Sequence, residues 1–477
     1  MVIVVAVVPA LLLWAIWRWA DGAAAAAENA APVPVVASQD QSTAALGTGV
    51  LSFRRAAGEL SRRLNVSAFE VAVQPLLQSV GSRSCAAISL DGRVIGTTDT
   101  STAVIPASNQ KLLVAAVALE VLGADHRFVT TLVGPAPVGG VIDGDVVLVG
   151  GGDPLLSGDW YATSGQERFP VFNATSLDEL ARRVVAAGVI EIRGAVLGDG
   201  SRYDDEFYVD TWGGGVAGVE AGPYDALMAN DSRVLGDDLR GSDPSASAAR
   251  EFVRVLATQG VVVSGGSGAG AADPSARQIA SVESVPLSGV IAEMLTNSDN
   301  NTAELLVKEI GFAATGQGTR DAGLAVIASV LAGWGIDTNG LVLGDGSGLS
   351  LANRLTCTTL LQVLQRVGVD SPVGQGLAVA GSTGTLTGIF EDTPLAGRLL
   401  GKTGTLNNPP FDQDPPAVKA LSGYLPVDGG GAIEFVLILN GPTISDQREY
   451  RPIWAELVDA LVSFPAVAGP AELGPIG

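Results

Sequence analysis

One apolar stretch that carries both a hydroxyl and an amine constrains this chain most. It runs from Ile105 to Gly123, is rich in Ala and Leu, and has Pro106 near its start and a glycine at its end. This pattern predicts a buried helix. Ser108 and Lys111 are three residues apart, so their side chains lie on one face of its first turn. The fold must therefore bury a lysine beside a serine at a helix N-terminus.

The chemistry of that pair depends on whether the lysine can lose its proton. A serine hydroxyl becomes a good nucleophile when a base takes its proton, and a neutral lysine can be that base. Ser-x-x-Lys alone is a weak signal, but the chain has 28 basic residues of which four are lysines: Lys111, Lys308, Lys402 and Lys419. Arginine cannot serve as a base near neutral pH. The use of lysine at position 111 therefore favours a catalytic role.

Charge and composition exclude several other classes of function. The 477 residues carry a formal net charge of −22, which argues against nucleic acid and anionic membrane surfaces as partners. The chain has one histidine, His126, and two cysteines, Cys85 and Cys357. These are too few for a zinc site without several carboxylates, so we expect no metal ion and no other cofactor. The cysteines fit either a disulfide or two buried thiols.

The N-terminal segment predicts export. Val2 to Trp17 is an uninterrupted apolar run, which suits a signal-peptide core or a short anchor. We expect residues 1–28 to be a signal peptide or membrane anchor, residues 29–65 a linker, and residues 466–477 a tail. Either interpretation places the rest of the chain in the cell envelope or outside the cell, secreted or anchored by residues 2–20. Membrane contact is then confined to that segment.

The remaining sequence predicts an α+β fold. Two strand-like runs flank an Asp-Gly turn at residues 85–97 and predict a hairpin, and three strands between 396 and 440 predict an antiparallel meander. Strand and helix patterns alternate over residues 131–284, which indicates an inserted α/β module. The catalytic domain then consists of two segments, 66–130 and 285–465, with an antiparallel sheet and helices.

A second motif, Ser298-Asp299-Asn300, precedes an apolar helical pattern. Ser298 or Asn297 is expected to cap a helix that begins there, with Asp299 favoured in its first turn. A helix start alone would explain these residue types. The motif therefore gains weight only in combination with others.

A third motif, Lys402-Thr403-Gly404-Thr405, lies in a predicted strand. A cation, a hydroxyl and a glycine on a strand edge would line a substrate groove and let a backbone approach closely. The order Ser-x-x-Lys, Ser-x-Asn, Lys-Thr-Gly resembles that of the serine acyltransferases that process peptidoglycan and of the serine β-lactamases.

Other stretches make the resemblance more specific. They are Gly150–Pro154, Asp345–Ser350, Asn353–Thr356 and Gly381–Leu386. Together with the three motifs, from about residue 70 to 465, they resemble the D-alanyl-D-alanine carboxypeptidase/endopeptidase family of low-molecular-mass, class C penicillin-binding proteins. The resemblance implies a serine β-lactamase/transpeptidase-like domain with a five-stranded sheet. It also implies a peptidoglycan stem peptide ending in D-Ala-D-Ala as substrate and β-lactams as inhibitors.

The resemblance also implies catalytic roles. Ser108 would attack the carbonyl between the two D-alanines while Lys111 takes its proton. Ser298 would pass a proton to the leaving amine, and Asn300 would hold the amide of the acyl side chain. Water would then hydrolyse the acyl-enzyme.

Substrate binding is implied for the third motif. Lys402 and Thr403 would bind the terminal carboxylate, and Gly404 would admit the substrate backbone. Backbone N–H groups of Ser108 and Thr405 would form the oxyanion hole.

Two alternatives to a serine D-Ala-D-Ala carboxypeptidase, with or without endopeptidase activity, stay open. A β-lactamase or esterase shares all three motifs, although the large insertion and the 345–350 stretch disfavour it. An inactive wall-binding or regulatory protein could use the same scaffold. Such a protein has no need for a base beside its serine.

Overall fold

The computed structural model describes residues 13–19, 65–213, 215–407, 416–428 and 431–464. Residues 1–63 and 64–477 form two separate units. Residues 13–19 are helical and the predicted linker ends in a helical Asn65, whereas the rest of the predicted export segment and linker lies outside the described residues. No described helix has the length and apolar character needed to cross a bilayer. The predicted tail also lies outside the described residues.

A six-stranded antiparallel sheet forms the centre of the catalytic part, in the order β13-β14-β15-β16-β1-β2. Its strands are β1 Cys85–Leu90, β2 Arg93–Thr98, β13 Ala378–Val379, β14 Leu400–Leu406, β15 Ala417–Pro426 and β16 Ala432–Gly441. The predicted hairpin is β1–β2 and the predicted meander is β14–β15–β16. The expected fold class is confirmed. The sheet exceeds the expected five strands because the two-residue β13 extends its edge.

Alternate residues of these strands face two separate cores. Ala87, Ala420 and Val436 face one core, and their neighbours Ala86, Leu421 and Leu437 face the other. This alternation follows from the period of two in a strand. The sheet is therefore the middle of three layers.

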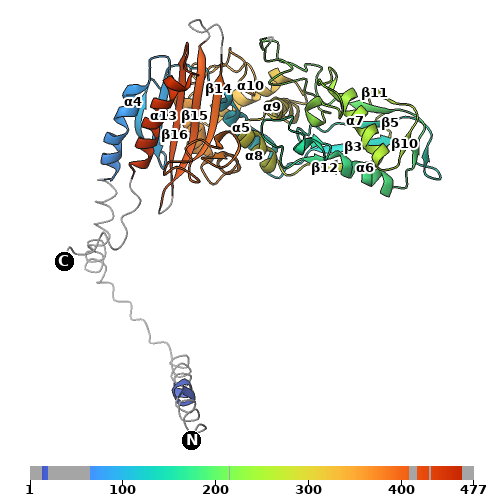
Figure 1. Cartoon of the computed structure of the whole chain (residues 1–477), viewed down its shortest axis with the longest axis horizontal. Coiled ribbons are helices and arrows are strands. Elements are labelled where there is room, and N and C mark those ends of the chain that lie inside the picture. The colour runs from blue at the N-terminus through green and yellow to red at the C-terminus, as the bar shows by residue number, and fades with distance from the viewer. Residues whose placement is uncertain (1–12, 20–64, 214, 408–415, 429–430, 465–477) are drawn as a thin grey trace, which may run out of the picture. The chain divides into compact units, whose positions relative to one another are not determined.

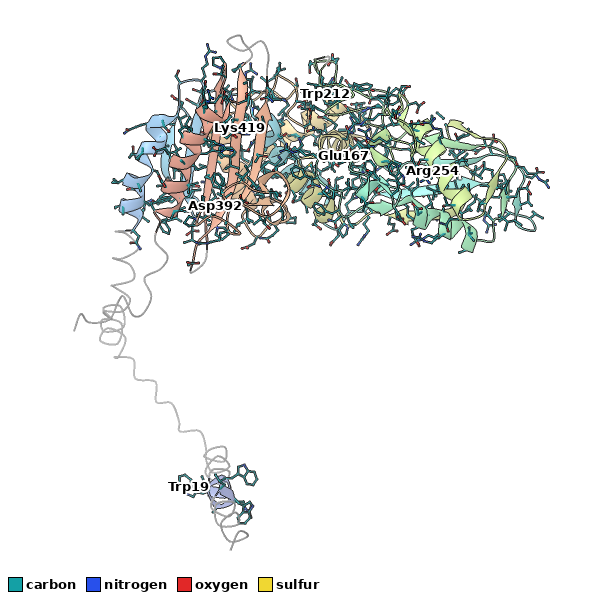
Figure 2. The ribbon with its side chains drawn as sticks, viewed as in Figure 1. Trp19, Glu167, Trp212, Arg254, Asp392 and Lys419 are labelled. Atoms are coloured by element: carbon teal, nitrogen blue, oxygen red, sulfur yellow. A yellow bond between two sulfur atoms is a disulfide. The ribbon has the colours of Figure 1, made fainter. Side chains whose placement is uncertain are left out.

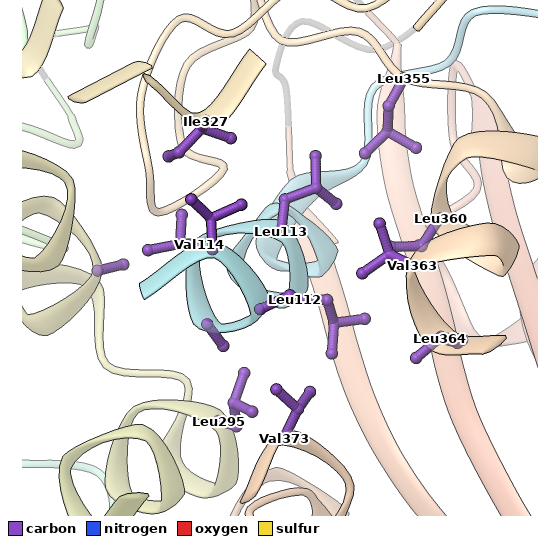
Figure 3. Packing of buried hydrophobic residues seen from close by; sticks show 14 of the residues in the cluster. Leu112, Leu113, Val114, Leu295, Ile327, Leu355, Leu360, Val363, Leu364 and Val373 are labelled. Carbon is purple, nitrogen blue, oxygen red and sulfur yellow. The ribbon is translucent and has the colours of Figure 1, made fainter. Parts of the chain in front are cut away.

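Helices cover both faces of the sheet (Figure 1). The first face packs against α5 Gln110–Leu122, α8 Leu287–Asn297, α9 Asn300–Thr315, α10 Arg320–Gly333, α11 Cys357–Val367 and the short α12 Pro372–Gln375. The other face packs against α4 Gln74–Ser79 and α13 Gln447–Val462. Figure 3 shows how Leu112, Leu113 and Val114 of α5 are surrounded by apolar side chains. The predicted buried helix is thus the core of its layer.

The region expected as an inserted module has its own sheets and core. A five-stranded sheet has the order β11-β9-β5-β3-β12, with strands β3 Val129–Gly134, β5 Val146–Val149, β9 Val196–Asp199, β11 Ser267–Ala269 and β12 Arg277–Glu283. Its parallel and antiparallel pairs pack against α6 Leu177–Ala186 and α7 Pro244–Thr258. Smaller sheets contain β4 Val141–Ile142, β8 Glu191–Ile192 and β10 Val262–Val263, and β6 Leu156–Ser157 with β7 Thr175–Ser176. We keep 131–284 as the proposed bounds of this module.

Two details differ from the sequence expectations. The strand expected over residues 141–150 is divided into β4 and β5, which belong to different sheets. The helix expected over residues 250–259 begins at Pro244, because the Asp243 side chain caps its N-terminus by accepting from Ala246 N.

The two cysteines form a disulfide. Cys85 lies in β1 and Cys357 begins α11, and their Cα atoms are 5.9 Å apart. Both residues are fully buried in the core around α5. The bond ties the first catalytic segment to the second across 272 residues of chain.

Candidate active site

Ser108 lies in a tight turn immediately before α5. A 3₁₀ turn spans Ala107–Asn109, and the α-helix begins at Gln110, so Ser108 precedes the helix in which it was expected. Ala107 has a φ of 49°, a left-handed conformation that is unusual outside glycine. A Cβ at Gly404 would lie 2.9 Å from Asn109 Nδ2, and one at Gly348 would lie 1.9 Å from the Ala107 carbonyl oxygen. The turn is therefore clamped between β14 and the 344–353 loop.

Lys111 is fully buried beneath this turn and has three neutral oxygen partners. Its Nζ lies 3.1 Å from Ser108 Oγ. It also lies 2.7 Å from Asn300 Oδ1 and 2.6 Å from the carbonyl oxygen of Ser347. Burial lowers the pKa of Lys111 to about 8, although the more distant Asp299 raises it. The neutral fraction of this amine near neutral pH is therefore far larger than that of an ordinary lysine.

Ser298 connects two helices rather than starting one. It has a φ of 65° and is the left-handed C-cap of α8, while Asp299 caps α9 by accepting from Thr302 N. The expectation that Ser298 or Asn297 caps the following helix is wrong, because α8 continues to Asn297 and ends at Ser298, which leaves Asp299 as the N-cap of α9. Lys402 Nζ donates to Ser298 Oγ at 2.8 Å.

Lys402 is fully buried in β14. Its Nζ also donates to the Thr403 carbonyl oxygen at 2.8 Å. Burial and the proximity of Lys111 hold the pKa of Lys402 well below its usual value. The Lys402 amine therefore lies beneath the surface and contacts other protein groups, and Ser298 is the side chain that it positions.

A cavity of about 380 Å³ opens above these groups. Five of the eight site residues expected from the sequence line it: Ser108, Ser298, Asn300, Thr403 and Thr405. Lys111 and Lys402 lie beneath them, and Gly404 gives the serine turn its space. β13 pairs with β14 only at Leu400 and Gly401, so among the described strands the following part of β14 has a free edge at the cavity. An extended peptide can pair with such an edge.

Sequence reasoning assigned no role to the loop that supplies the Ser347 carbonyl. Asp345 is fully buried and accepts from Gly348 N at 2.9 Å, Ser350 N at 2.6 Å and Asn353 Nδ2 at 2.7 Å. Trp212 Nε1 donates to the same carboxylate at 2.8 Å. An acidic residue among glycines was the available signal. Its carboxylate folds the loop so that the Ser347 carbonyl faces Lys111.

Glu304 holds the same loop from α9. Its carboxylate accepts from Ser347 N at 2.7 Å and from Gly346 N. Burial raises the pKa of Glu304 to about 7. Two buried carboxylates therefore fix one carbonyl oxygen.

Part of the cavity wall is acidic and was also missed. It includes Glu167, Asp231, Glu293 and Asp299, with Arg240 paired to Asp231. Figure 2 shows Glu167, a residue of the proposed module, on the side of the module that is nearer the central sheet. Burial, together with Asp231, raises the pKa of Glu167 to about 7. These residues are scattered in sequence, so no local motif could have revealed the wall.

Fold and site together define a class. A serine lies within hydrogen-bond distance of a buried lysine of lowered pKa, beside a free strand edge, which is the arrangement of a lysine-assisted serine acyltransferase.

Comparison with known proteins specifies the family. The model of the D-Ala-D-Ala carboxypeptidase 3 (S13) family matches residues 70–235 and 225–461. This chain belongs to that family, which confirms the resemblance seen in its motifs. It is a serine-type D-Ala-D-Ala carboxypeptidase of the penicillin-binding protein group.

Individual relatives support the same family assignment. The chain is 30% identical to a D-alanyl-D-alanine carboxypeptidase of Actinomadura over 77% of this chain and 79% of that one. It is 33% identical to a carboxypeptidase of Mycobacterium tuberculosis over 70% of this chain and 71% of that one. The structure of penicillin binding protein 4 from Haemophilus influenzae shares the fold, with a TM-score of 0.64 and 21% identity over 81% of this chain and 99% of that one.

Proposed function

We propose that this protein removes the terminal D-alanine from peptidoglycan stem peptides through an acyl-enzyme on Ser108. One observation carries the assignment of the nucleophile. Lys111 Nζ lies 3.1 Å from Ser108 Oγ, and its other two partners are neutral oxygen atoms. A lysine so held can be neutral and take the hydroxyl proton.

Acylation then proceeds by attack of Ser108 Oγ on the penultimate D-Ala carbonyl. The negative charge on the carbonyl oxygen is stabilised by the backbone N–H groups of Ser108 and Thr405. As the C–N bond breaks, Ser298 passes a proton to the leaving D-Ala amine, and its hydroxyl is held for this by Lys402. Water completes the cycle by hydrolysing the ester on Ser108, which regenerates the hydroxyl.

The substrate is held along the free edge of β14. The Thr403 and Thr405 hydroxyls, which line the cavity, bind the terminal carboxylate. Lys402 acts on that carboxylate indirectly, because it is buried beneath the cavity wall. The Asn300 amide holds the peptide on the acyl side.

A fluorescent penicillin tests the nucleophile. We expect the parent chain to form a stable adduct detectable by intact mass, and Ser108→Ala to fold equally well and form none. Release of D-Ala from a peptide ending in D-Ala-D-Ala should follow the same pattern. A folded parent that neither labels nor releases D-Ala would instead support the inactive wall-binding alternative, and rapid turnover of a cephalosporin would support a β-lactamase.

The disulfide bears on where the enzyme acts. A buried bond such as Cys85–Cys357 persists in oxidising compartments outside the cytoplasm. Together with the family, it supports an extracytoplasmic protein that is exported through residues 2–20. Fractionation of cells, with and without that segment, tests whether the protein is retained by an anchor or released.

A further inference from the structure

Lys419 is one of the four lysines, and the reaction described above gives it no role. It lies in β15, directly opposite Thr405 of β14 in the antiparallel register. Figure 2 shows Lys419 on the sheet, and Thr405 lines the cavity. The contact between the two side chains is solvent-exposed and lies beside the substrate site.

The contacts of Lys419 fix its amine in one place. Its Nζ donates to Thr405 Oγ1 at 3.0 Å. The same Nζ lies 4.5 Å from the centre of the Tyr450 ring and 5.4 Å from that of Trp454, both on α13. Aromatic rings attract the cation through their faces but offer no conventional acceptor. The Lys419 ammonium therefore donates its hydrogen bond to the Thr405 hydroxyl oxygen.

That contact determines where the Thr405 hydroxyl proton can point. A threonine hydroxyl has one proton to donate and two lone pairs that accept. Because the Lys419 amine donates to one lone pair of Thr405 Oγ1, the hydroxyl proton of Thr405 must point away from Lys419. Because Thr405 lines the cavity, the proton is available to an acceptor bound there.

The surroundings of this end of the cavity favour an anion as that acceptor. Arg168 lines the cavity, and both Arg168 and Arg451 are close enough to lower the pKa of Lys419, in addition to its burial. Carboxylates such as those of Glu167 and Asp231 also line the cavity, together with Arg233 and Arg240. The cations clustered at Lys419 therefore attract a substrate carboxylate to Thr405, the hydrogen-bond partner of Lys419.

We propose that Lys419 is a positioning residue that aims the Thr405 hydroxyl proton at the terminal carboxylate of the substrate and so favours peptides with a free C-terminus. This inference rests on the proposed function, in which Thr405 binds that carboxylate. Lys419 itself does not touch the substrate.

A pair of substrates measures this selectivity. One is a peptide ending in D-Ala-D-Ala with a free carboxylate, and the other is its C-terminal amide. In Lys419→Met, which keeps most of the stem but removes the donor, we expect kcat/KM for the carboxylate to fall about tenfold, with little change for the amide. Lys419→Arg, which can donate and stack, should retain most of the parent's preference.

Arg451→Met is the matched control. It removes an exposed cation next to Lys419 but not the hydrogen bond to Thr405. We expect it to keep the parent's ratio of the two kcat/KM values. An equal loss in Arg451→Met and Lys419→Met would show that general charge, and not the orientation of Thr405, is responsible and would overturn the inference.

A double-mutant cycle gives a second test. Once Thr405→Val has removed the hydroxyl, adding Lys419→Met should cause no further loss of selectivity. Additive losses, or equal losses on both substrates, would contradict the positioning role. A parent chain that acylates Ser108 while Lys419→Met keeps full selectivity would refute this inference alone, whereas a parent that fails to acylate would refute the proposed function.

Discussion

Two fully buried lysines on neighbouring helices have different partners. Lys111 of α5 contacts three neutral oxygen atoms. Lys308 of α9 contacts the Asp204 carboxylate at 2.6 Å and two backbone carbonyls, with the Tyr224 ring 5.1 Å away. A carboxylate partner favours the charged amine, whereas neutral acceptors in a desolvated site let the amine lose its proton. Burial alone therefore does not identify a catalytic lysine.

The two sites also differ in what they hold together. Lys111 joins residues of the three active-site segments, from α5, α9 and the 344–353 loop. Lys308 joins α9 to residues 204–206, which lie in the proposed inserted module. The first site supports proton transfer, and the second supports the position of the module against the helix that begins with Asn300.

Replacing Lys111 gives the largest expected effect. Lys111→Met keeps the apolar stem and removes the base, so we expect the rate of Ser108 acylation by a fluorescent penicillin to fall at least about 10³-fold. The melting temperature should stay within a few degrees of the parent's, because a desolvated amine is lost. Acylation at the parent rate would rule out Lys111 as the base.

The corresponding change at Lys308 should affect stability instead. Lys308→Met leaves the Asp204 carboxylate and two carbonyls without their donor, and we expect unfolding in urea to show a loss of about 2–4 kcal/mol. The folded fraction should acylate at close to the parent rate.

Tyr224→Phe is the matched control for this site. It keeps the ring beside Lys308 and removes a buried hydroxyl that has no hydrogen-bond partner in the described part of the chain. Its stability should stay within about 1 kcal/mol of the parent's. A tenfold loss of acylation in folded Lys308→Met would erase the distinction between the two lysines.

A smaller change can make the catalytic site resemble the structural one. The parent's acylation rate should rise with pH through a midpoint near 8, because the base works only after losing its proton. Asn300→Asp places a carboxylate against Lys111, as Asp204 is placed against Lys308. We expect the midpoint to move up by about one unit or more, with about a tenfold lower rate at pH 7.

Asn300→Ala separates this charge effect from the loss of the amide. It removes the same contact without adding a carboxylate, so its midpoint should not move upward. An unchanged midpoint in Asn300→Asp, measured over the same pH range, would mean that Lys111 does not set the pH dependence.

Local patterns are sufficient to predict much of the fold. Ser108 and Lys111 meet because helical spacing brings them together, and the Asp-Gly turn fixes the β1–β2 hairpin. The order of the three motifs indicates a serine acyltransferase or β-lactamase, and the further stretches such as Asp345–Ser350 indicate the family. Each of these inferences depends on residues that are close in sequence or on a recognisable combination of short motifs.

The features of the site that the sequence did not predict depend on contacts between residues that are distant in sequence. The Ser347 carbonyl reaches Lys111 only because Asp345 and Glu304 fold its loop, and a carbonyl leaves no trace in residue type. Ser298 adopts a left-handed conformation that serine seldom favours, so its position between two helices could not be anticipated. The acidic cavity wall is assembled by tertiary packing from residues of the proposed module, Glu167 and Asp231, and of the second catalytic segment, Glu293 and Asp299.

The Cys85–Cys357 bond makes the polypeptide between them a closed ring. This ring contains Ser108, the proposed module and Ser298, whereas Lys402 lies outside it. A protease that cuts once within residues 131–284 would therefore yield fragments that remain covalently joined, one carrying Ser108 and the other carrying Ser298 and Lys402. Such a nicked enzyme would separate on a gel only after reduction. Its active-site halves would stay at a high effective concentration, as in a split enzyme with a built-in tether.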